Sequence, residues 1–270
     1  MGMPDRDRCE KVGTEAALAA GDLLMKRFRT EITVAHKGVI DLVTEVDLAA
    51  EALIVSTLQR EFPACAILAE EGHGETARGP VTWIIDPLDG TTNYAHGLPF
   101  FAVSIGLEVD GELEFGVVHI PAMEEVFIAH RGHGARLNSM PIHVSGTSSL
   151  GASLLTTGFP YDIRTSRDTN LEYFAEFSRR SFAVRRAGSA AMDFCYVAAG
   201  YYDGFWELKL NPWDCAAGYL MVREAGGRVT NFCGRTGSIY ERESLATNGL
   251  IHDAMLNILS QPGATAAEPQ

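Results

Sequence analysis

The chain has 270 residues, of which 46% are hydrophobic and 21% charged. These proportions are typical of a folded globular protein and exclude disordered, collagen-like and coiled-coil chains. The chain carries 35 Asp and Glu against 22 Lys and Arg, a formal net charge of −13. Because nucleic acids and membrane surfaces attract proteins largely through clustered Lys and Arg, this balance argues against both as direct partners.

The sequence carries no signal for membrane insertion or secretion. No apolar run approaches the roughly 20 residues of a spanning helix, and the first ten residues mix both charges without the apolar stretch of a secretory signal. The five cysteines are odd in number and include no C-x-x-C pair, which is typical of free thiols in a reducing compartment. We therefore expect a cytoplasmic protein.

The first half of the chain is predicted to begin with helices and to continue as strands. Apolar residues at helical spacing predict an amphipathic helix over residues 6–28. Thr44 is predicted to cap a second helix that ends near residue 60. Short apolar runs predict strands that are buried on both faces at 66–69 and 81–85. Further strands are predicted at 100–109, 112–120 and 125–130.

Two turns and an alternation of elements organise the rest of the chain. Asp110-Gly111 is a strong two-residue hairpin signal, and 131–134 is predicted to be a glycine-rich turn. Strands are predicted at 154–157, 182–185 and 203–208, and helices at 166–181, 189–199 and 213–225. We expect an N-terminal lobe over 1–145, a C-terminal lobe over 146–260 and a disordered tail over 261–270.

The most informative stretch is Trp83-Ile84-Ile85-Asp86-Pro87-Leu88-Asp89-Gly90-Thr91-Thr92-Asn93. A buried strand delivers Asp86 at its end, and Pro87 is expected to stop the ladder of the sheet. Asp89 follows three residues after Asp86, so a turn can bring both carboxylates to one point. The next residues open a short helix, whose N-terminus favours a phosphate group.

Three further acidic positions stand at the predicted ends of elements. Asp47 lies in the first turn of its helix, Glu70-Glu71 ends an apolar strand, and Asp214 begins another helix. Hard divalent cations such as Mg²⁺ bind oxygen ligands of this kind together with substrate phosphate. Carboxylates at several element ends are therefore typical of a multi-metal centre for phosphoryl transfer.

These residues resemble the signatures of the inositol monophosphatase family. The resemblance is carried by Glu70-Glu71, by 83–93 and by 213–218, and it extends through 41–47, 186–191 and 222–227. It runs in the right order from Lys37 to Gly227. The bacterial inositol-1-monophosphatase branch is the most similar, through Thr157-Gly158-Phe159-Pro160 and Tyr196-Val197-Ala198-Ala199-Gly200.

The resemblance implies a fold and an activity. The implied fold is α+β, a layered α-β-α-β-α sandwich of the type shared by inositol monophosphatase and fructose-1,6-bisphosphatase. The implied enzyme is a cytoplasmic, lithium-inhibited homodimer with two to three Mg²⁺ in each active site. It would hydrolyse myo-inositol monophosphate by in-line attack of a metal-activated water, without a covalent intermediate.

By position, the resemblance also implies the residues of the site. The implied metal ligands are Glu70, Asp86, the carbonyl of Leu88, Asp89 and Asp214. The implied catalytic residues are Asp47, Glu70 and Thr91. The implied phosphate-binding residues are Gly90, Thr91 and Thr92. The implied contacts to the inositol hydroxyls are Gly188, Ser189, Ala190 and Glu207.

Several alternatives stay open at this point. The metal centre is equally compatible with histidinol phosphate, fructose 1,6-bisphosphate or 3′-phosphoadenosine 5′-phosphate as the substrate. A non-catalytic, partner-binding protein on this fold is a second hypothesis, against which the intact set of acidic residues argues. The order Asp86-x-x-Asp89-Gly90-Thr91 also approaches the haloacid-dehalogenase pattern D-x-D-G-T, but its spacing is one residue longer, which moves the second Asp off the alternating strand face.

Overall fold

The computed structural model describes residues 4–36, 42–72 and 78–260, and the statements below refer to these residues. Its helices are α1 (Arg6–Arg27), α2 (Glu45–Glu61), α3 (Thr91–Ala95), α4 (Leu171–Arg180), α5 (Ala190–Ala198), α6 (Pro212–Glu224) and α7 (His252–Leu259). Its strands are β1 (Val34–His36), β2 (Leu42–Thr44), β3 (Ala66–Ala69), β4 (Val81–Asp89), β5 (Ala102–Val109), β6 (Glu112–Ile120), β7 (Glu125–His130), β8 (Gly134–Leu137), β9 (Met140–Ile142), β10 (Leu154–Thr157), β11 (Ala183–Arg185), β12 (Gly204–Leu208), β13 (Arg228–Thr230) and β14 (Glu243–Thr247).

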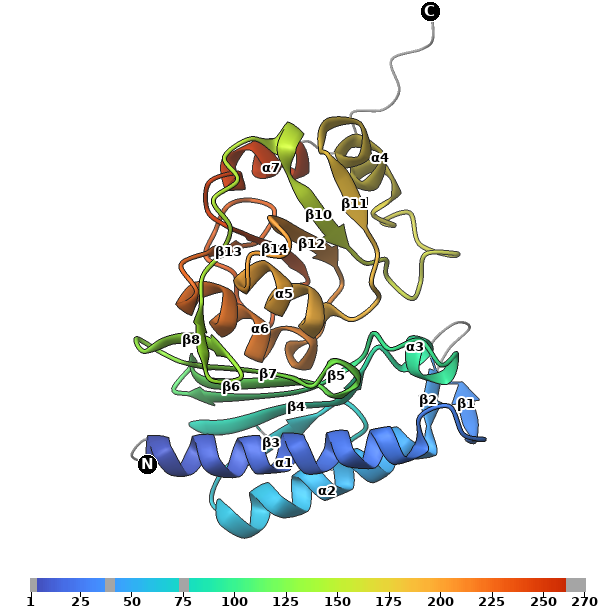
Figure 1. The fold of residues 1–270 in the computed structure, drawn as a ribbon, viewed down its shortest axis with the longest axis vertical. Helices are drawn as coiled ribbons and strands as arrows, with labels where there is room; N and C mark the ends of the chain where they lie inside the picture. The colour runs from blue at the N-terminus through green and yellow to red at the C-terminus, as the bar shows by residue number, and fades with distance from the viewer. Residues whose placement is uncertain (1–3, 37–41, 73–77, 261–270) are drawn as a thin grey trace, which may run out of the picture.

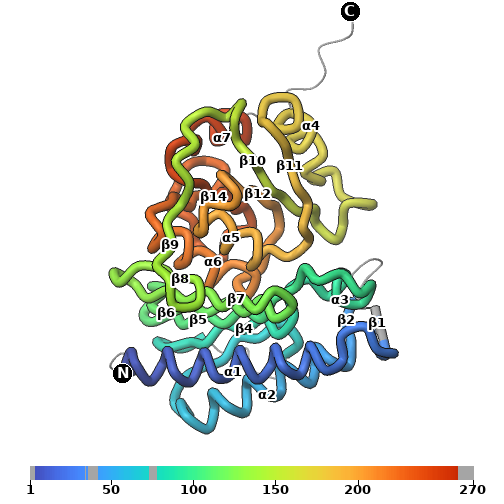
Figure 2. The backbone as a smooth tube through the Cα atoms, in the orientation of Figure 1, coloured from blue at the N-terminus to red at the C-terminus, as the bar shows by residue number. Residues whose placement is uncertain are grey.

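The elements stack as alternating layers (Figures 1 and 2). Helices α1 and α2 cover the outer face of one sheet, and α5 and α6 lie between that sheet and a second one. Helices α4 and α7 cover the outer face of the second sheet (Figure 1). The predicted α+β fold with α-β-α-β-α layers is thereby confirmed.

The first sheet has the strand order β3-β4-β5-β6-β7-β8-β9. Its β3–β4 pair is parallel, and every later pair is antiparallel. Strands β5 and β6 meet at Asp110 and Gly111, whose φ angles of 50° and 87° are both positive. Two consecutive positive φ angles define the tight hairpin turn that the sequence predicts.

The second sheet has the order β11-β10-β12-β14-β13 and mixes both pairing directions. Strand β10 is parallel to β11 and to β12, whereas β14 runs antiparallel to β12 and β13. The sequence predicts β10, β11 and β12 but not β13 and β14. These last two strands, Arg228-Val229-Thr230 and Glu243-Ser244-Leu245-Ala246-Thr247, contain no continuous apolar run of four or more residues that would mark them as strands in the sequence.

The expectation that Pro87 stops the ladder of β4 is wrong. Strand β4 runs on to Asp89, with Asp86 opposite Ser104 and Asp89 opposite Ala102 and a register shift between them. A bulge of this kind leaves the intervening residues outside the regular ladder, so a proline without an N–H is tolerated there. The bulge also turns the strand at the point where its two aspartates stand.

The helix predicted over 166–181 begins later than expected, at Leu171. Its preceding residue, Asn170, has a left-handed backbone with φ of 70° and a buried side chain. The Asn170 Nδ2 donates to the carbonyl of Gly158 at 2.6 Å, and its Oδ1 accepts from Nε1 of Trp206 at 2.6 Å. These bonds hold the segment before α4 as a loop against β12.

Other predictions are confirmed with small shifts in their bounds. Thr44 caps α2, its side chain accepting from the N–H of Val46, and Asp47 completes a capping box. The glycine-rich turn after β7 is fixed by Glu224, which accepts from the N–H groups of Gly132 and Gly134 at 2.8 Å each. All five cysteines are free thiols. No helix of the described residues is long and apolar enough to cross a membrane.

The layers between the two sheets share one hydrophobic core. This core contains residues of both sheets and of α5 and α6, including Ile84, Phe127, Phe194 and Phe205. The lobe boundary predicted near residue 145 stays a prediction, and the tail predicted over 261–270 lies outside the described residues.

Helix α6 approaches the first sheet closely, and glycines permit the approach. A Cβ at Gly116 would lie 2.9 Å from the Cα of Ala217 and 3.2 Å from its carbonyl oxygen. Since backbone cannot yield as a flexible side chain can, we expect Gly116→Ala to destabilise the fold by about 1–3 kcal/mol. Thermal unfolding measures this, with Gly146→Ala as the control because no atom lies within 4 Å of its added Cβ. Equal unfolding temperatures of the two variants would contradict the packing described here.

Candidate active site

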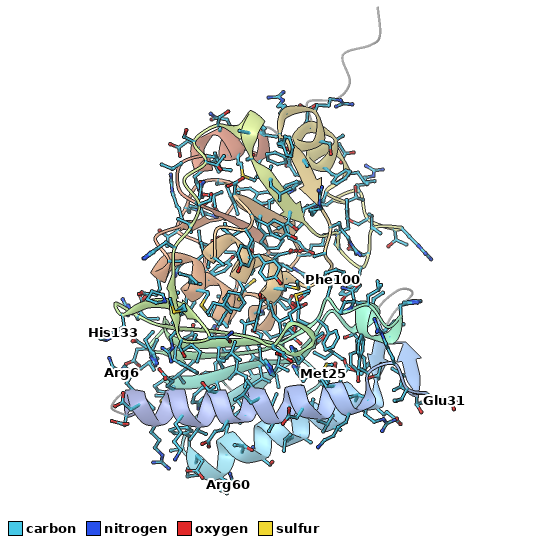
Figure 3. The ribbon with its side chains drawn as sticks, in the orientation of Figure 1. Arg6, Met25, Glu31, Arg60, Phe100 and His133 are labelled. Carbon is cyan, nitrogen blue, oxygen red and sulfur yellow. The ribbon has the colours of Figure 1, made fainter. Side chains whose placement is uncertain are left out.

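A cavity of about 350 Å³ lies where the end of β4 meets the N-termini of α5 and α6 and the end of β12. Phe100, whose carbonyl bonds the cavity residue Asn93, lies at the boundary between the two halves of the molecule (Figure 3). The lining residues are Asp89, Gly90, Thr92, Asn93, Gly158, Phe159, Pro160, Tyr161, Asp162, Arg186, Gly188, Ser189, Ala190, Glu207, Leu208, Lys209, Leu210, Asn211, Asp214 and Arg242.

A cluster of carboxylates adjoins the floor of this cavity. Asp86 is 1% exposed and accepts a hydrogen bond from the N–H of Leu88 at 3.0 Å. Its pKa is raised well above the usual value, first by burial and then by the charges of Glu70, Asp89 and Asp214. Four carboxylates, one from the residue after β3, two from β4 and one from α6, therefore lie close enough to repel one another, and this repulsion favours a bound cation.

Asp89 and Asp214 are held by the N-termini of two helices. The Asp89 Oδ2 accepts from Oγ of Ser189 and from the N–H of Ala191, both at 2.7 Å, at the start of α5. The Asp214 Oδ2 accepts from the N–H of Asn211 at 2.6 Å, at the start of α6. One oxygen of each carboxylate is thereby held by protein donors, and both residues line the cavity.

Burial also raises the pKa of these two carboxyl groups. For Asp89 burial raises the pKa to about 6, although the bonds from Ser189 and Ala191 lower it. For Asp214 burial is again the main cause of a raised pKa, and the charges of Asp89 and Glu70 add to it. A divalent cation would oppose both effects, because it stabilises the ionised form of each group.

The donor set fits a hard divalent cation such as Mg²⁺. Every candidate ligand offers oxygen, from the four carboxylates or from the backbone carbonyl of Leu88. Within the described ranges, no three Asp, Glu, His or Cys side chains already stand close enough together to enclose a metal ion. A site of this kind completes its coordination with water and substrate oxygens, as Mg²⁺ sites usually do.

Asp47 and Thr91 form a second, buried part of the site. The Thr91 Oγ1 lies 2.9 Å from Oδ1 of Asp47 and 3.0 Å from the carbonyl oxygen of Leu88. The other Asp47 oxygen accepts from the N–H of Thr44 at 2.9 Å as part of the α2 capping box. The single hydroxyl proton of Thr91 is directed toward Asp47 or Leu88, so its oxygen lone pairs are free to accept a bond from a third partner.

Gly90 and Asn93 shape the wall between the two sheets. Gly90 has a φ of 95°, and a Cβ there would lie 2.7 Å from the carbonyl oxygen of Phe100. The Asn93 Nδ2 donates toward the carbonyl oxygens of Phe100 at 2.7 Å and Ala187 at 2.9 Å. These contacts place the start of α3 directly against the 187–190 segment that leads into α5.

Glu207 stands on the other wall, on β12. Burial raises its pKa well above the usual value, the charges of Asp193 and Asp89 raise it further, and the charge of Arg186 lowers it. A Cβ at Gly158 would lie 2.1 Å from Oε1 of Glu207, so the loop after β10 packs directly on this carboxyl group.

The structure divides the residues implied by the family resemblance into two groups. Those lining the cavity are Asp89, Gly90, Thr92, Gly188, Ser189, Ala190, Glu207 and Asp214. Those behind its floor are Asp47, Glu70, Asp86, Leu88 and Thr91, which contact one another or a cavity residue. Sequence reasoning missed Asn93, Arg186, Lys209 and Arg242 as cavity residues. Asn93 and Arg186 fall within the quoted motifs, whereas nothing in the sequence marks the other two.

Comparison with known proteins gives a consistent result. The chain matches the family described as "Inositol monophosphatase family" over residues 5–263. It is 46% identical to an inositol-1-monophosphatase of Synechocystis over 96% of this chain and 89% of that protein. It is 43% identical to the Nus factor SuhB of Pseudomonas aeruginosa over 92% of this chain and 94% of that protein.

Solved structures give the same picture. The inositol monophosphatase of Anabaena superposes with a TM-score of 0.85 at 43% identity, over 93% of this chain and 94% of that one. The extragenic suppressor protein suhB of Bartonella henselae superposes with a TM-score of 0.88 at 37% identity, over 94% and 99% of the two chains. Sequence motifs, layered fold and cavity therefore lead to one conclusion: the chain belongs to the inositol monophosphatase family.

Proposed function

We propose that the protein is a Mg²⁺-dependent phosphomonoesterase that hydrolyses myo-inositol monophosphate to inositol and phosphate. The observation that carries the proposal is the cluster of Glu70, Asp86, Asp89 and Asp214 at the floor of a small cavity. In this cluster the charges of Glu70 and Asp89 raise the pKa values of both Asp86 and Asp214. Such a cluster has no stabilising role by itself, because buried like charges destabilise a fold. The destabilisation of the fold by this cluster is explained if the cluster holds divalent cations that bind a phosphate group.

The proposed ligands are Glu70, Asp86, the Leu88 carbonyl, Asp89 and Asp214, holding two to three Mg²⁺. When bound, Mg²⁺ would neutralise the phosphate and lower the pKa of a coordinated water. The backbone N–H groups of Gly90, Thr91 and Thr92 precede or begin α3, where the first N–H groups of a helix have no partner within it. They are proposed to bind phosphate oxygens.

Thr91 and Asp47 are proposed to orient the attacking water. Because the Thr91 hydroxyl donates its proton toward Asp47 or the Leu88 carbonyl, its oxygen can accept a hydrogen bond from the attacking water. This hydrogen bond orients the water so that one of its oxygen lone pairs points toward phosphorus, in line with the leaving alcohol. Glu70, which directly follows β3, is proposed to accept the water proton. As the bond between phosphorus and the leaving oxygen breaks, a second water near Asp214 is proposed to give that oxygen a proton. No side chain of the protein forms a bond to phosphorus in this scheme.

The residues around the cavity mouth are proposed to bind the alcohol part of the substrate. Gly188, Ala190 and Glu207 offer backbone groups and a carboxylate to sugar hydroxyls. Ser189 acts differently, since its hydroxyl already donates to Asp89 and so positions that carboxylate. The cavity of about 350 Å³ lies at the small end of the usual range for ligand sites, which suits a single ring.

Displacement of the Glu207 carboxyl group should weaken binding of the alcohol part of the substrate while the metal site stays intact. In Gly158→Ala the added Cβ would displace the Glu207 carboxyl group, and we expect kcat/KM to fall roughly 10-fold to 100-fold. The affinity for Mg²⁺, followed by calorimetry, should stay unchanged. Gly151→Ala is the matched control, because the nearest atom to its Cβ is 3.8 Å away. An unaltered kcat/KM in Gly158→Ala would exclude Glu207 from the substrate site.

The names of relatives point to two kinds of role, since both an inositol-1-monophosphatase and a Nus factor are more than 40% identical to this chain. The intact carboxylate cluster supports catalysis over a purely partner-binding role. Inhibition by lithium, a homodimeric state and a cytoplasmic location complete the proposal. Histidinol phosphate, fructose 1,6-bisphosphate and 3′-phosphoadenosine 5′-phosphate are the competing substrates.

The proposal is tested by phosphate release from these four substrates with and without Mg²⁺. We expect release that depends on Mg²⁺, is abolished by chelation, and is fastest with myo-inositol 1-phosphate. Failure to release phosphate from any of them in the presence of Mg²⁺ would contradict the enzymatic function. Faster turnover of another substrate would keep the chemistry and replace the substrate.

A further inference from the structure

A loop of residues 158–170 connects β10 to α4 (Figure 1). Its residues from Gly158 to Asp162 line the cavity. A Cβ at Gly158 would overlap the carboxyl group of Glu207, whose Oε1 would lie 2.1 Å away. Because Glu207 is proposed to bind the alcohol part of the substrate, this loop is the wall of the cavity that adjoins that part.

Both ends of the loop are held by the protein. Asn170 is buried, and its side chain donates to the carbonyl of Gly158 at 2.6 Å and accepts from Nε1 of Trp206 at 2.6 Å. The ring of Phe159 lies 5.6 Å from the ring of Phe174 in α4, measured between their centroids. These contacts fix the ends of the loop on β12 and α4 and leave the position of its middle to be explained.

The middle of the loop is bound by Lys209, which directly follows β12. Its Nζ lies 2.9 Å and 2.8 Å from the two carboxylate oxygens of Asp162 and 2.8 Å from Oγ of Ser166. Among the described residues, every other hydrogen bond of residues 162–168 has its partner within residues 160–168. Lys209 thus provides the hydrogen bonds that attach this middle part to the second sheet.

The backbone at Lys209 is fixed independently of its side chain. Its N–H donates to the carbonyl oxygen of Arg242 at 2.5 Å, and its carbonyl oxygen accepts from Nη2 of Arg242 at 3.2 Å. Its φ of 65° lies in the left-handed region, which is sterically less favourable for lysine than for glycine. A lysine at this position is therefore best explained by the contacts that its side chain makes.

We propose that Lys209 is a positioning residue, whose bonds to Asp162 and Ser166 hold the loop against β12 and so limit the alcohol part of the substrate to a small ring. Without the ammonium group, residues 162–168 would lose their hydrogen bonds to the sheet. The cavity of about 350 Å³ would then open on the side of the loop. This inference rests on the proposed phosphatase function and adds a determinant of its substrate selectivity.

Lys209→Met tests the inference, because methionine keeps a long unbranched side chain and removes the ammonium group. Two phosphate esters are compared, myo-inositol 1-phosphate, whose alcohol has one ring, and adenosine 3′-monophosphate, whose alcohol is much larger. We expect the ratio of their kcat/KM values to shift about tenfold toward the adenosine compound, as for an altered pocket. The loss for the inositol compound should be in KM more than in kcat, because the proposed metal ligands and Thr91 lie outside the loop. An unchanged ratio would overturn the inference.

Asp162→Ala and the double variant separate positioning from charge balance. If Lys209 and Asp162 act through one contact, each single variant and the double variant should shift the ratio by about the same factor. If Lys209 only neutralised Asp162, Lys209→Met would raise KM equally for both phosphates, and the double variant would recover the native KM. That result would overturn the inference. Lys11→Met is the matched control and should keep the native ratio, because Lys11 is exposed on α1 and does not line the cavity.

Proteolysis tests the loop without any assay of phosphatase activity. Arg164 and Arg167 are exposed in the middle of the loop, so an arginine-specific protease can cleave after them when the loop moves away from β12. We expect this cleavage, followed by mass spectrometry, to be roughly fivefold to tenfold faster in Lys209→Met than in the native protein or in Lys11→Met. Equal cleavage rates would overturn the inference while the phosphatase function stands. Faster cleavage in a protein that releases phosphate from no substrate would overturn the phosphatase function and keep the role of Lys209 in holding the loop.

Discussion

Asp89→Asn is expected to lower kcat by about 10³-fold or more, because it removes a negative charge from the proposed metal site, where metal-ion catalysis supplies several kcal/mol. The fold should survive the change. The carboxylate oxygen that accepts from Ser189 and Ala191 has an equivalent in the Asn side chain. Removing one of several mutually repelling carboxylates should also leave the metal-free protein at least as stable as before.

Initial rates at saturating Mg²⁺, together with thermal unfolding in chelator, measure both effects. Asp110→Asn is the control, since Asp110 lies in the β5–β6 turn with φ of 50°, a conformation that Asn also tolerates. This variant should keep its full rate. A near-normal rate in Asp89→Asn would show that Asp89 is not a metal ligand.

Thr91→Ala is expected to lower kcat about 10²-fold, the usual contribution of a group that assists proton transfer or orients water. The change removes the hydroxyl that lies between Asp47 and the Leu88 carbonyl but leaves the backbone N–H in place. KM for the phosphate substrate should therefore change little. The proposed role of Thr91 predicts a loss in kcat, whereas a role in substrate binding alone would raise KM.

Thr91→Ser is the matched control, because its hydroxyl can reach the same two acceptors. We expect it to recover most of the activity lost in Thr91→Ala. Steady-state kinetics of both variants at one Mg²⁺ concentration makes the comparison. If Thr91→Ser and Thr91→Ala lowered kcat equally, the methyl group of Thr91 rather than its hydroxyl would be needed for the reaction.

The candidate site could be predicted from the sequence because its main parts coincide with strong local signals. Asp86 and Asp89 follow a continuous apolar strand, and Asp47 belongs to a capping box that is visible as Thr44 followed three residues later by an acid. Local signals of this kind do not depend on the tertiary fold. These signals predicted where the acidic residues lie, and the resemblance to a family supplied the roles proposed for them.

The opposite wall of the cavity could not be predicted in this way. Lys209 and Arg242 reach it because β12 pairs with β14, a pairing of segments far apart in the chain. Similarly, α4 starts late because Asn170 bonds to β12 and to the loop after β10. Long-range hydrogen bonds leave no periodic trace in the sequence, so only the folded chain reveals them.

The bulge in β4 shows how both kinds of information combine. Pro87 suggested the end of a strand, yet pairing of Asp89 with Ala102 continues the sheet beyond it. The bulge brings Asp89 to the start of α5, where Ser189 and Ala191 bind it. The local irregularity thus links the two sheets at the proposed site.

The role of the carboxylate cluster is tested most directly by single-turnover hydrolysis of myo-inositol 1-phosphate in ¹⁸O-labelled water. The protein is first freed of metal and then assayed with and without added Mg²⁺. We predict no phosphate without Mg²⁺, and with Mg²⁺ one labelled oxygen in the released phosphate and none in the protein. Equal release in the presence of chelator, or label in a protein carboxylate, would contradict direct attack by water at a metal site formed by Glu70, Asp86, Asp89 and Asp214.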